Sequence, residues 1–254
     1  MDTNYLNTFF TGKFLMKLDE IDSTNNFLKA WVANNKPIEG TVILTEKQNA
    51  GRGQAGTSWQ SKSGENITLS VLYTPSFLEA RNQFVLSAAV ALGVYEAVSA
   101  VLPSKMVKIK WPNDILLENK KVCGILIENS LMGSYLQNSI IGIGLNVLQT
   151  DFGDLSLATS LKKEGYTGEV DNVIKILLEN LEAQYLRLKS GRYESILEDY
   201  HAHLLGKDEV RSFIADDVSF EGIIQGVEND GRLRISTTNG DRLFYHKEVS
   251  FVLL

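Results

Sequence analysis

The chain contains little that would mark it as a secreted, fibrous or strongly charged protein. One cysteine among 254 residues excludes an internal disulfide and a thiolate zinc site. The 20 glycines and 4 prolines are too few for a low-complexity linker protein. No apolar run reaches the roughly 18–20 residues of a membrane-spanning helix. Asp2 precedes the first basic residue, Lys13, which is not the pattern of a signal peptide.

Positive charge is also scarce. The 25 basic residues are outnumbered by 31 acidic ones, which leaves a net charge of −6. A chain of this balance has no general attraction to nucleic acid or to an anionic membrane. We therefore expect a cytoplasmic protein with neither nucleic acid nor a membrane among its partners.

The composition is that of an ordinary globular protein, with 44% hydrophobic and 22% charged residues. At about 150 residues per domain, the length suggests a large domain with a small one. Apolar strands alternate with helical patterns, which predicts an α+β fold with a mixed β-sheet flanked by helices. The expected strands are 13–18, 41–45, 67–72, 107–111, 115–117, 122–128 and 140–147, and the expected helices are 24–31, 84–102 and 170–205 with a break at Gly191.

After Gly206 the pattern changes to short β-runs. Asp230-Gly231 and Asn239-Gly240 are strong hairpin signals because they supply the positive φ of tight turns. The expected strands are 218–227, 232–237, 241–245 and 249–253. We predict a catalytic or binding domain at 1–206 and a small β-domain at 207–254.

Gly51 to Gly56 match the pattern GxGxxG after a predicted strand. A dinucleotide site requires a helix to open at the third glycine, but turn-forming residues follow it. A P-loop requires a lysine where Thr57 stands. Two interpretations remain: a flexible surface loop, or a loop whose N–H groups and Arg52 wrap around an anion.

A lysine-rich hairpin is predicted between Lys105 and Lys121. Its five lysines face only Asp114 and Glu118, a local excess of positive charge in an acidic chain. Asp114 and Lys121 can lie opposite each other across the hairpin. The pair is either a weak surface ion pair or part of a site for a buried anion, and the local charge favours the anionic ligand.

Five short segments occur in an order that resembles the biotin protein ligase family. They are Ser23-Thr24-Asn25, Glu46 to Gly53 (EKQNAGRG), Lys110 to Asp114 (KWPND), Lys121 to Glu128 (KVCGILIE) and Gly142 to Val147 (GIGLNV). The resemblance covers roughly residues 14–254. It implies a catalytic domain like that of class II aminoacyl-tRNA synthetases and a C-terminal SH3-like β-barrel.

The resemblance also implies site residues. Positions matching those that bind biotin are Ser23, Thr24, Asn25, Gln48, Gly51, Arg52, Gly53, Lys121 and Gly124. Polar groups are the chemistry that a ureido ring requires. Positions matching the nucleotide site are Arg52, Gly53, Gln54, Trp59, Lys110, Asn113, Lys121 and Asn146. Lys121, Arg52 and Asp114 are the implied catalytic residues, with Asp114 expected either to orient the acceptor amine or to take its proton.

Two features depart from the family pattern. Gln54 stands where many members carry an arginine after the GRG triplet, which removes one charge from the anion site. Ser23 lies so near the start of the chain that we expect a monofunctional form, without the N-terminal DNA-binding domain of repressor-type members.

The implied reaction converts biotin and ATP, with Mg²⁺, to biotinyl-5′-AMP and then transfers biotin to a lysine of a biotin carboxyl carrier protein domain. The metal ligands cannot be named from the sequence. Two alternatives stay open: a lipoate-type ligase, whose substrate has no urea group, and a protein that binds biotin without turnover. A homodimer formed through an exposed sheet edge is also open.

For four further residues the structural interpretation is favoured. Cys123 is expected to be a small buried thiol. His201 and His203 are two apart on a helix and so point in different directions. His246 has no partner near it in the sequence.

Overall fold

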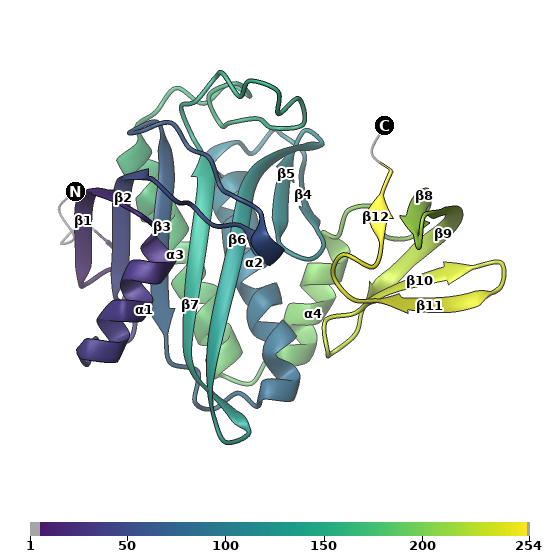
Figure 1. Cartoon of the computed structure of the whole chain (residues 1–254), viewed down its shortest axis with the longest axis horizontal. Coiled ribbons are helices and arrows are strands. Elements are labelled where there is room, and N and C mark those ends of the chain that lie inside the picture. Colours follow the sequence, from purple (N-terminus) through teal and green to yellow (C-terminus); the bar gives the residue numbers. More distant parts are fainter. Residues whose placement is uncertain (1–5, 253–254) are drawn as a thin grey trace.

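A seven-stranded mixed sheet forms the centre of the computed structural model, which describes residues 6–252 (Figure 1). Its spatial order is β1-β2-β3-β7-β6-β5-β4. The strands are β1 (Leu15–Ile21), β2 (Val42–Gln48), β3 (Asn66–Tyr73), β4 (Val107–Lys110), β5 (Asp114–Leu117), β6 (Lys120–Met132) and β7 (Tyr135–Asn146). β1 runs parallel to β2, and the other neighbours are antiparallel, so the predicted mixed sheet is confirmed.

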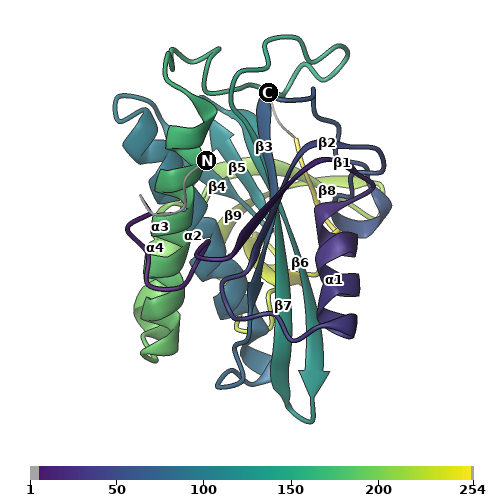
Figure 2. The ribbon, with the colours of Figure 1, turned by 90° about the vertical axis from the view of Figure 1, so that its left-hand side faces the viewer.

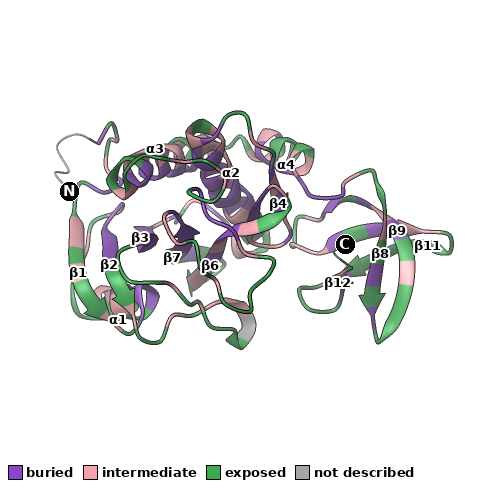
Figure 3. Cartoon of the chain, turned by 90° about the horizontal axis from the view of Figure 1, so that it is seen from above, coloured by how far each residue is buried: buried purple, intermediate pink, exposed green. Residues whose placement is uncertain are grey.

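Helices cover both faces of this sheet. Figure 2 shows α2 (Gln83–Val101), α3 (Val170–Lys189) and α4 (Tyr193–Ala202) on one face and α1 (Thr24–Asn34) on the other. Short 3₁₀ turns lie at Gln54–Gly56 (η2) and Ala80–Asn82 (η3). The main core lies between the sheet and α2 and α3, where Figure 3 shows buried residues facing one another. β3, an interior strand between β2 and β7, is buried along its whole length.

The most apolar helix is a core helix. By length and composition, Ala80–Val101 is the one stretch of the described residues that could cross a membrane, and an 18-residue window within it has a mean hydropathy of 1.9. However, 67% of that window is buried inside the protein. The prediction of a buried helix at this place is confirmed.

Local sequence signals account for how the site-bearing segments begin and turn. Ser23 is the N-cap of α1, and its side chain accepts a hydrogen bond from the Asn26 N–H. Glu118 and Asn119 adopt φ of 50° and 63°, the geometry of a tight turn, and join β5 to β6. The predicted lysine-rich hairpin is therefore formed.

The C-terminal part forms a second, antiparallel sheet. Its order is β11-β10-β9-β8-β12. The strands are β8 (Val210–Ala215), β9 (Val218–Val227), β10 (Leu233–Thr237), β11 (Gly240–Phe244) and β12 (Ser250–Phe251). Gly231 and Gly240 carry the positive φ that their hairpins require.

This second sheet differs from the predicted barrel because it does not close. Among the described residues β11 and β12 remain its two edges, and the predicted end of the last strand, Leu253, lies outside them. The connection between these strands instead carries His246 and Lys247 to a cavity of the first domain. Packed aromatic rings stabilise the sheet. The centre of the Phe213 ring lies 5.6 Å from that of Phe220 and 5.5 Å from that of Phe251.

Two hydrogen bonds attach the second sheet to the first domain. The Val227 N–H donates to Nε2 of His201 on α4 at 2.9 Å, and the indole N–H of Trp111 donates to the Gly231 carbonyl at 3.0 Å. Both reach across more than twenty residues of sequence. The second sheet is therefore held against the end of the hairpin that carries Asp114.

The His201 contact predicts a pH dependence of stability. Burial, with Lys207 nearby, lowers the pKa of His201 below its ordinary value of 6.5. The contribution of neutral His201 to the free energy of unfolding is therefore complete above about pH 6.5. It is lost as the pH falls through the lower pKa that His201 has in the folded protein. The protonated ring cannot accept the Val227 hydrogen bond, so we expect a loss of about 1 kcal/mol.

Thermal unfolding between pH 7.5 and pH 5 measures this effect. His201→Gln keeps an acceptor but does not titrate, so its melting temperature should fall by about 2–4 °C less over that range than that of the wild type. Equal falls in the two proteins would contradict the role assigned to His201.

The structure also contains strand segments that the sequence did not predict. β6 continues to Met132 and β7 begins at Tyr135, and the two strands pair with each other as a long exposed hairpin. The sequence did not predict this part because its residues form no continuous apolar run. β8 was not predicted either. Val210 and Ile214 on this strand are exposed, so the alternation of buried residues is confined to Phe213 and Ala215.

Candidate active site

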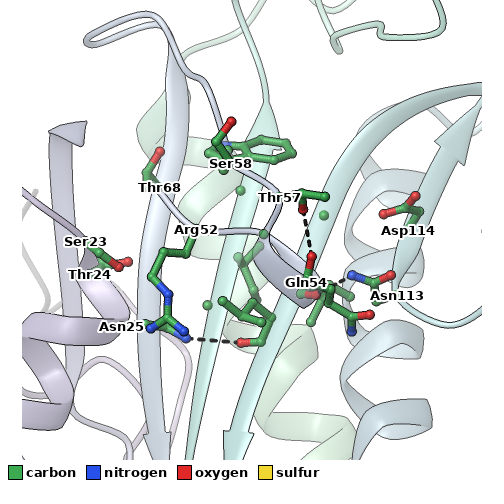
Figure 4. A pocket seen from close by; sticks show the side chains of 18 of the residues that line it. Ser23, Thr24, Asn25, Arg52, Gln54, Thr57, Ser58, Thr68, Asn113 and Asp114 are labelled. Carbon is green, nitrogen blue, oxygen red and sulfur yellow. Dashed lines mark hydrogen bonds between the residues drawn. The ribbon is translucent and has the colours of Figure 1, made fainter. Parts of the chain in front are cut away.

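A cavity of about 230 Å³ lies between the start of α1, the glycine loop (residues 51–59) and strands β5, β6 and β7. Most of the predicted site residues line it: Ser23, Thr24, Asn25, Gln48, Arg52, Gly53, Gln54, Trp59, Asn113, Asp114, Lys121 and Gly124. Figure 4 shows Ser23, Thr24 and Asn25 on one side, Asn113 and Asp114 on the other, and Arg52 between them. The fold thus brings together segments about 100 residues apart in sequence.

One end of the cavity is a buried polar network. Gln48 Oε1 accepts from the Thr24 N–H at 2.8 Å and from the Thr24 hydroxyl at 3.2 Å. Ser70, which is fully buried, contacts Thr24 Oγ1 at 2.8 Å and donates to Asn25 Oδ1 at 2.6 Å. Because the side chains orient one another, the ligand-facing atoms are fixed before a ligand arrives.

Glycines of β6 and β7 form the floor of the cavity. A Cβ on Gly142 would lie 2.4 Å from Asn25 Oδ1, and a Cβ on Gly144 would lie 2.2 Å from Cε2 of Trp59. Gly124, paired with Gly144 across the strands, lies under the same indole. These positions need glycine because side chains lie directly against the backbone.

A carboxylate connects the polar network to the glycine loop. Glu128 Oε2 accepts from the Asn25 amide at 2.9 Å, and Glu128 Oε1 lies 3.2 Å from Nη1 of Arg52. Arg52 also donates to Asn26 Oδ1 at 2.7 Å. The same carboxylate, Glu128, therefore helps to position both Asn25 at the polar end and Arg52 in the glycine loop.

The other end of the cavity is cationic. Lys121 Nζ lies 2.7 Å from Asp114 Oδ1 and 5.7 Å from the centre of the Trp59 ring. The backbone of Lys121 is held on both sides by residues 157 and 159, through the bonds Lys121 N–H to Leu157 O and Thr159 N–H to Lys121 O. The predicted pairing of Asp114 with Lys121 is confirmed, and the pair faces a cavity.

Three predicted site residues lie behind this lining. A Cβ on Gly51 would lie 2.3 Å from the Trp59 carbonyl, so this glycine allows the loop to close on itself. Lys110 lines a neighbouring groove, 3.9 Å from Asp114 Oδ2. Asn146 is 4% exposed and donates to the Thr159 carbonyl, which belongs to the segment that holds Lys121.

Sequence reasoning missed several residues at the site. Ser70 and Glu128 are isolated polar residues on predicted strands, and only the alternation of strand faces could have suggested that they lie on the side of the sheet that contacts the site. His246 and Lys247 arrive from the second sheet, which no local pattern indicates. Burial and the charge of Lys247 lower the pKa of His246, so the ring is neutral at pH 7.

The residues set aside as structural have ordinary contacts. Cys123 is buried, and burial raises the pKa of its thiol, which keeps the thiol protonated. His201 accepts from Val227, whereas the His203 ring stacks on Tyr95 at 4.1 Å. The two histidines therefore point in different directions, as predicted.

Comparison with known proteins identifies the class to which this fold and site belong. The sequence pattern of the biotin/lipoate A/B protein ligase family matches residues 18–146. The chain belongs to this family.

Individual relatives and a solved structure are also similar to this chain. The bifunctional ligase/repressor BirA of Bacillus subtilis is 32% identical over 252 residues, which cover 96% of this chain and 76% of the relative. A biotin–[acetyl-CoA-carboxylase] ligase of Mycobacterium tuberculosis is 31% identical over 83% of this chain. The biotin protein ligase from Aquifex aeolicus, solved with biotin and ATP, is 27% identical with a TM-score of 0.78, over 94% of this chain and 98% of that one.

Proposed function

We propose that this chain is an ATP-dependent biotin protein ligase that forms biotinyl-5′-AMP and transfers biotin to a lysine of a biotin carboxyl carrier protein domain. The observation that carries this proposal is that a pre-ordered polar end and a cationic end share one cavity. Relatives named as biotin–[acetyl-CoA-carboxylase] ligases support it, and so does the similar structure solved with biotin and ATP.

The polar end fits a ureido ring. Two of its residues, Thr24 and Asn25, are buried, and Gln48 is hydrogen-bonded to Thr24. These side chains are already oriented by their partners. A polar site of this kind loses much of its affinity when the ligand lacks the groups that it pairs with. This is the reason to prefer biotin over lipoate.

In the first step the biotin carboxylate attacks the α-phosphorus of ATP, an acyl–phosphate bond forms, and pyrophosphate leaves. The step brings two anions together, so catalysis consists mainly of positioning and charge neutralisation. We assign the neutralisation to Lys121 and Arg52, which line the same cavity.

In the second step the lysine amine attacks the acyl carbon, the carbon–nitrogen bond forms and AMP leaves. The lysine ammonium gives up one proton before the attack and a second as the amide forms. Asp114 lies at this end of the cavity beside Lys121, where it can orient the ammonium and accept the first proton. The second proton leaves with AMP.

The residues present also fit magnesium. No three His, Cys, Asp or Glu side chains come together as a metal site in residues 6–252. Magnesium in nucleotide sites binds through one or two carboxylates and the substrate phosphates, so no such cage is needed. Asp114 is the carboxylate that lines the cavity, and it would hold the magnesium ion. A bound magnesium ion would neutralise charge on the phosphates.

Exchange of labelled pyrophosphate into ATP tests the first step. We expect exchange that depends on biotin and does not occur with lipoate, and the same preference in direct titration. Folded protein that binds biotin but supports no exchange would favour the alternative of a binding protein without turnover. The structural reason for keeping that alternative is Gln54, an uncharged residue that lines the anion end.

The carrier protein as acceptor, a cytoplasmic location and a homodimer remain predictions. Labelling of a purified carrier domain with biotin, and the mass of the protein in solution, test the first and the last.

A further inference from the structure

The glycine loop is a small hairpin that lines the cavity and is held at two places. Arg52 and Ser58 pair as an isolated β-bridge, and the Trp59 N–H donates to the Gly51 carbonyl at 3.0 Å. One side of this hairpin is held by Arg52, which contacts Glu128. The other side is held by the Trp59 side chain, to which the chemistry proposed above gives no role.

The Trp59 indole packs on β6 and β7 at a place where each strand has a glycine. The three atoms nearest to a Cβ on Gly144 all belong to the indole, at 2.2–2.6 Å, and a Cβ on Gly124 would lie 3.1 Å from indole Cζ3. The two glycines are paired across the strands. The indole N–H is buried, so this edge of the ring faces protein and not the cavity. Gly124 and Gly144 therefore form a seat for the ring, the indole seat.

The side chain of Lys121 lies against the same ring. Its Nζ is 5.7 Å from the ring centre, which is the distance of a cation–π contact. Its Cε and Nζ would lie 3.3 and 3.4 Å from a Cβ on Gly124, so the lysine and the indole meet over one glycine. Because Nζ is also 2.7 Å from Asp114 Oδ1, a carboxylate and an aromatic ring together fix where the ammonium lies.

The ring contributes something to Lys121 that the carboxylate cannot. The lysine side chain has several rotatable bonds and is 38% exposed, so its ammonium is placed only as well as its contacts place it. An aromatic face attracts an ammonium without cancelling its charge, which stays available to an anion. This contact exists only while Trp59 occupies the indole seat. Seating of the glycine loop and placement of Lys121 are therefore coupled.

We propose that Trp59 is a positioning residue through which the seated glycine loop orders Lys121 for the first step, with Gly124 and Gly144 as its seat. This inference rests on the proposed function, because the first step is the one that Lys121 serves. The family resemblance placed Trp59 at the nucleotide. The role proposed here requires no contact between the ring and the nucleotide.

Replacing the ring tests the contact with Lys121. In Trp59→Leu the kcat of biotin-dependent pyrophosphate exchange should fall about tenfold, because the ammonium loses its cation–π partner. Trp59→Phe keeps an aromatic face and should stay within about threefold of wild type. Gln137→Ala, at an exposed position on β7, is the matched control and should exchange at the wild-type rate. A ring that only bound the nucleotide would instead raise the KM for ATP and leave kcat unchanged.

Filling the seat tests the glycines. The methyl group of Gly144→Ala meets the indole first, so the ring must move and exchange should again fall about tenfold. In a Trp59→Leu background the same substitution should cost less than about twofold, because the ring that it displaces is no longer there. Independent effects of the two substitutions would contradict the seat. If Gly144→Ala does not fold, the Trp59 variants alone decide, since they change only a loop.

Proteolysis gives a measurement that does not depend on activity. Trypsin cleavage after Arg52, identified by mass, measures how often the loop leaves its seat. Trp59→Leu should be cut there about tenfold faster than the wild type and Gln137→Ala. Wild-type exchange in Trp59→Leu, or a change only in its KM for ATP, would overturn the inference. Absence of exchange in the wild-type protein would overturn the proposed function instead, and the cleavage rates would still show whether the ring seats the loop.

Discussion

Lys121→Ala should reduce biotin-dependent pyrophosphate exchange by about 100- to 1000-fold, the usual effect of removing a charge-stabilising group from a reaction centre. The side chain is the cation that lies 2.7 Å from Asp114 in the cavity. Without it, the Asp114 carboxylate faces the incoming biotin carboxylate and α-phosphate with only the more distant Lys110, 3.9 Å away, as an opposing charge. The variant therefore loses an attraction and gains a repulsion.

The neighbouring lysine provides the control. Lys120 is exposed and does not line the cavity, so Lys120→Ala should keep wild-type exchange. Circular dichroism and melting temperature should be close to wild type in both variants, because Lys121 is partly exposed. Wild-type exchange in folded Lys121→Ala would remove this residue from the mechanism.

Glu128→Ala is expected to have the second-largest effect, a rise of about 10- to 100-fold in the KM for biotin. The carboxylate is a positioning residue that orients Asn25 at one end of the site and Arg52 in the glycine loop. Its removal takes away the charge-assisted hydrogen bonds that it accepts from Asn25 and from Arg52. A buried hydrogen bond to a charged group is worth about 1.5–3 kcal/mol. Arg52 is partly exposed, so its share lies at the lower end.

The conservative variant separates positioning from folding. Glu128→Gln keeps an oxygen for the Asn25 amide but no charge for Arg52, so its KM should lie between those of the wild type and Glu128→Ala. Steady-state kinetics with biotin as the varied substrate measure the effect, and kcat at saturating biotin should change less than KM. An unchanged KM in Glu128→Ala would show that neither contact orders the site.

Local signals predicted the elements that carry the site. Ser23 starts α1, and the turn at Glu118 and Asn119 places Lys121 next to Asp114. Each of these outcomes depends on residues a few positions apart. The GxGxxG match could likewise be rejected as a dinucleotide site locally, and η2 at Gln54–Gly56 is only one short turn.

Other parts of the site depend on packing that no local pattern contains. Glu128 acts through its contacts with Asn25 and Arg52, which lie 103 and 76 positions away. The strand signals predicted a small β-domain and the family resemblance implied that it closes into a barrel, but the connection before β12 leaves the sheet and brings His246 and Lys247 to the cavity. The strand signals correctly predicted β-strands in this part of the chain. Whether the sheet closes into a barrel depends on where the connection between β11 and β12 packs.

The amino-acid sequence alone determined which groups are available: a capped helix start, a cationic hairpin, and glycines where side chains must approach the backbone. Hydrogen bonding between near neighbours and the steric freedom of glycine suffice for these features. The tertiary structure decided that they share one cavity and that Glu128 connects its two halves. These features arise from contacts between distant segments, whose geometry is set by the packing of the whole sheet and its helices.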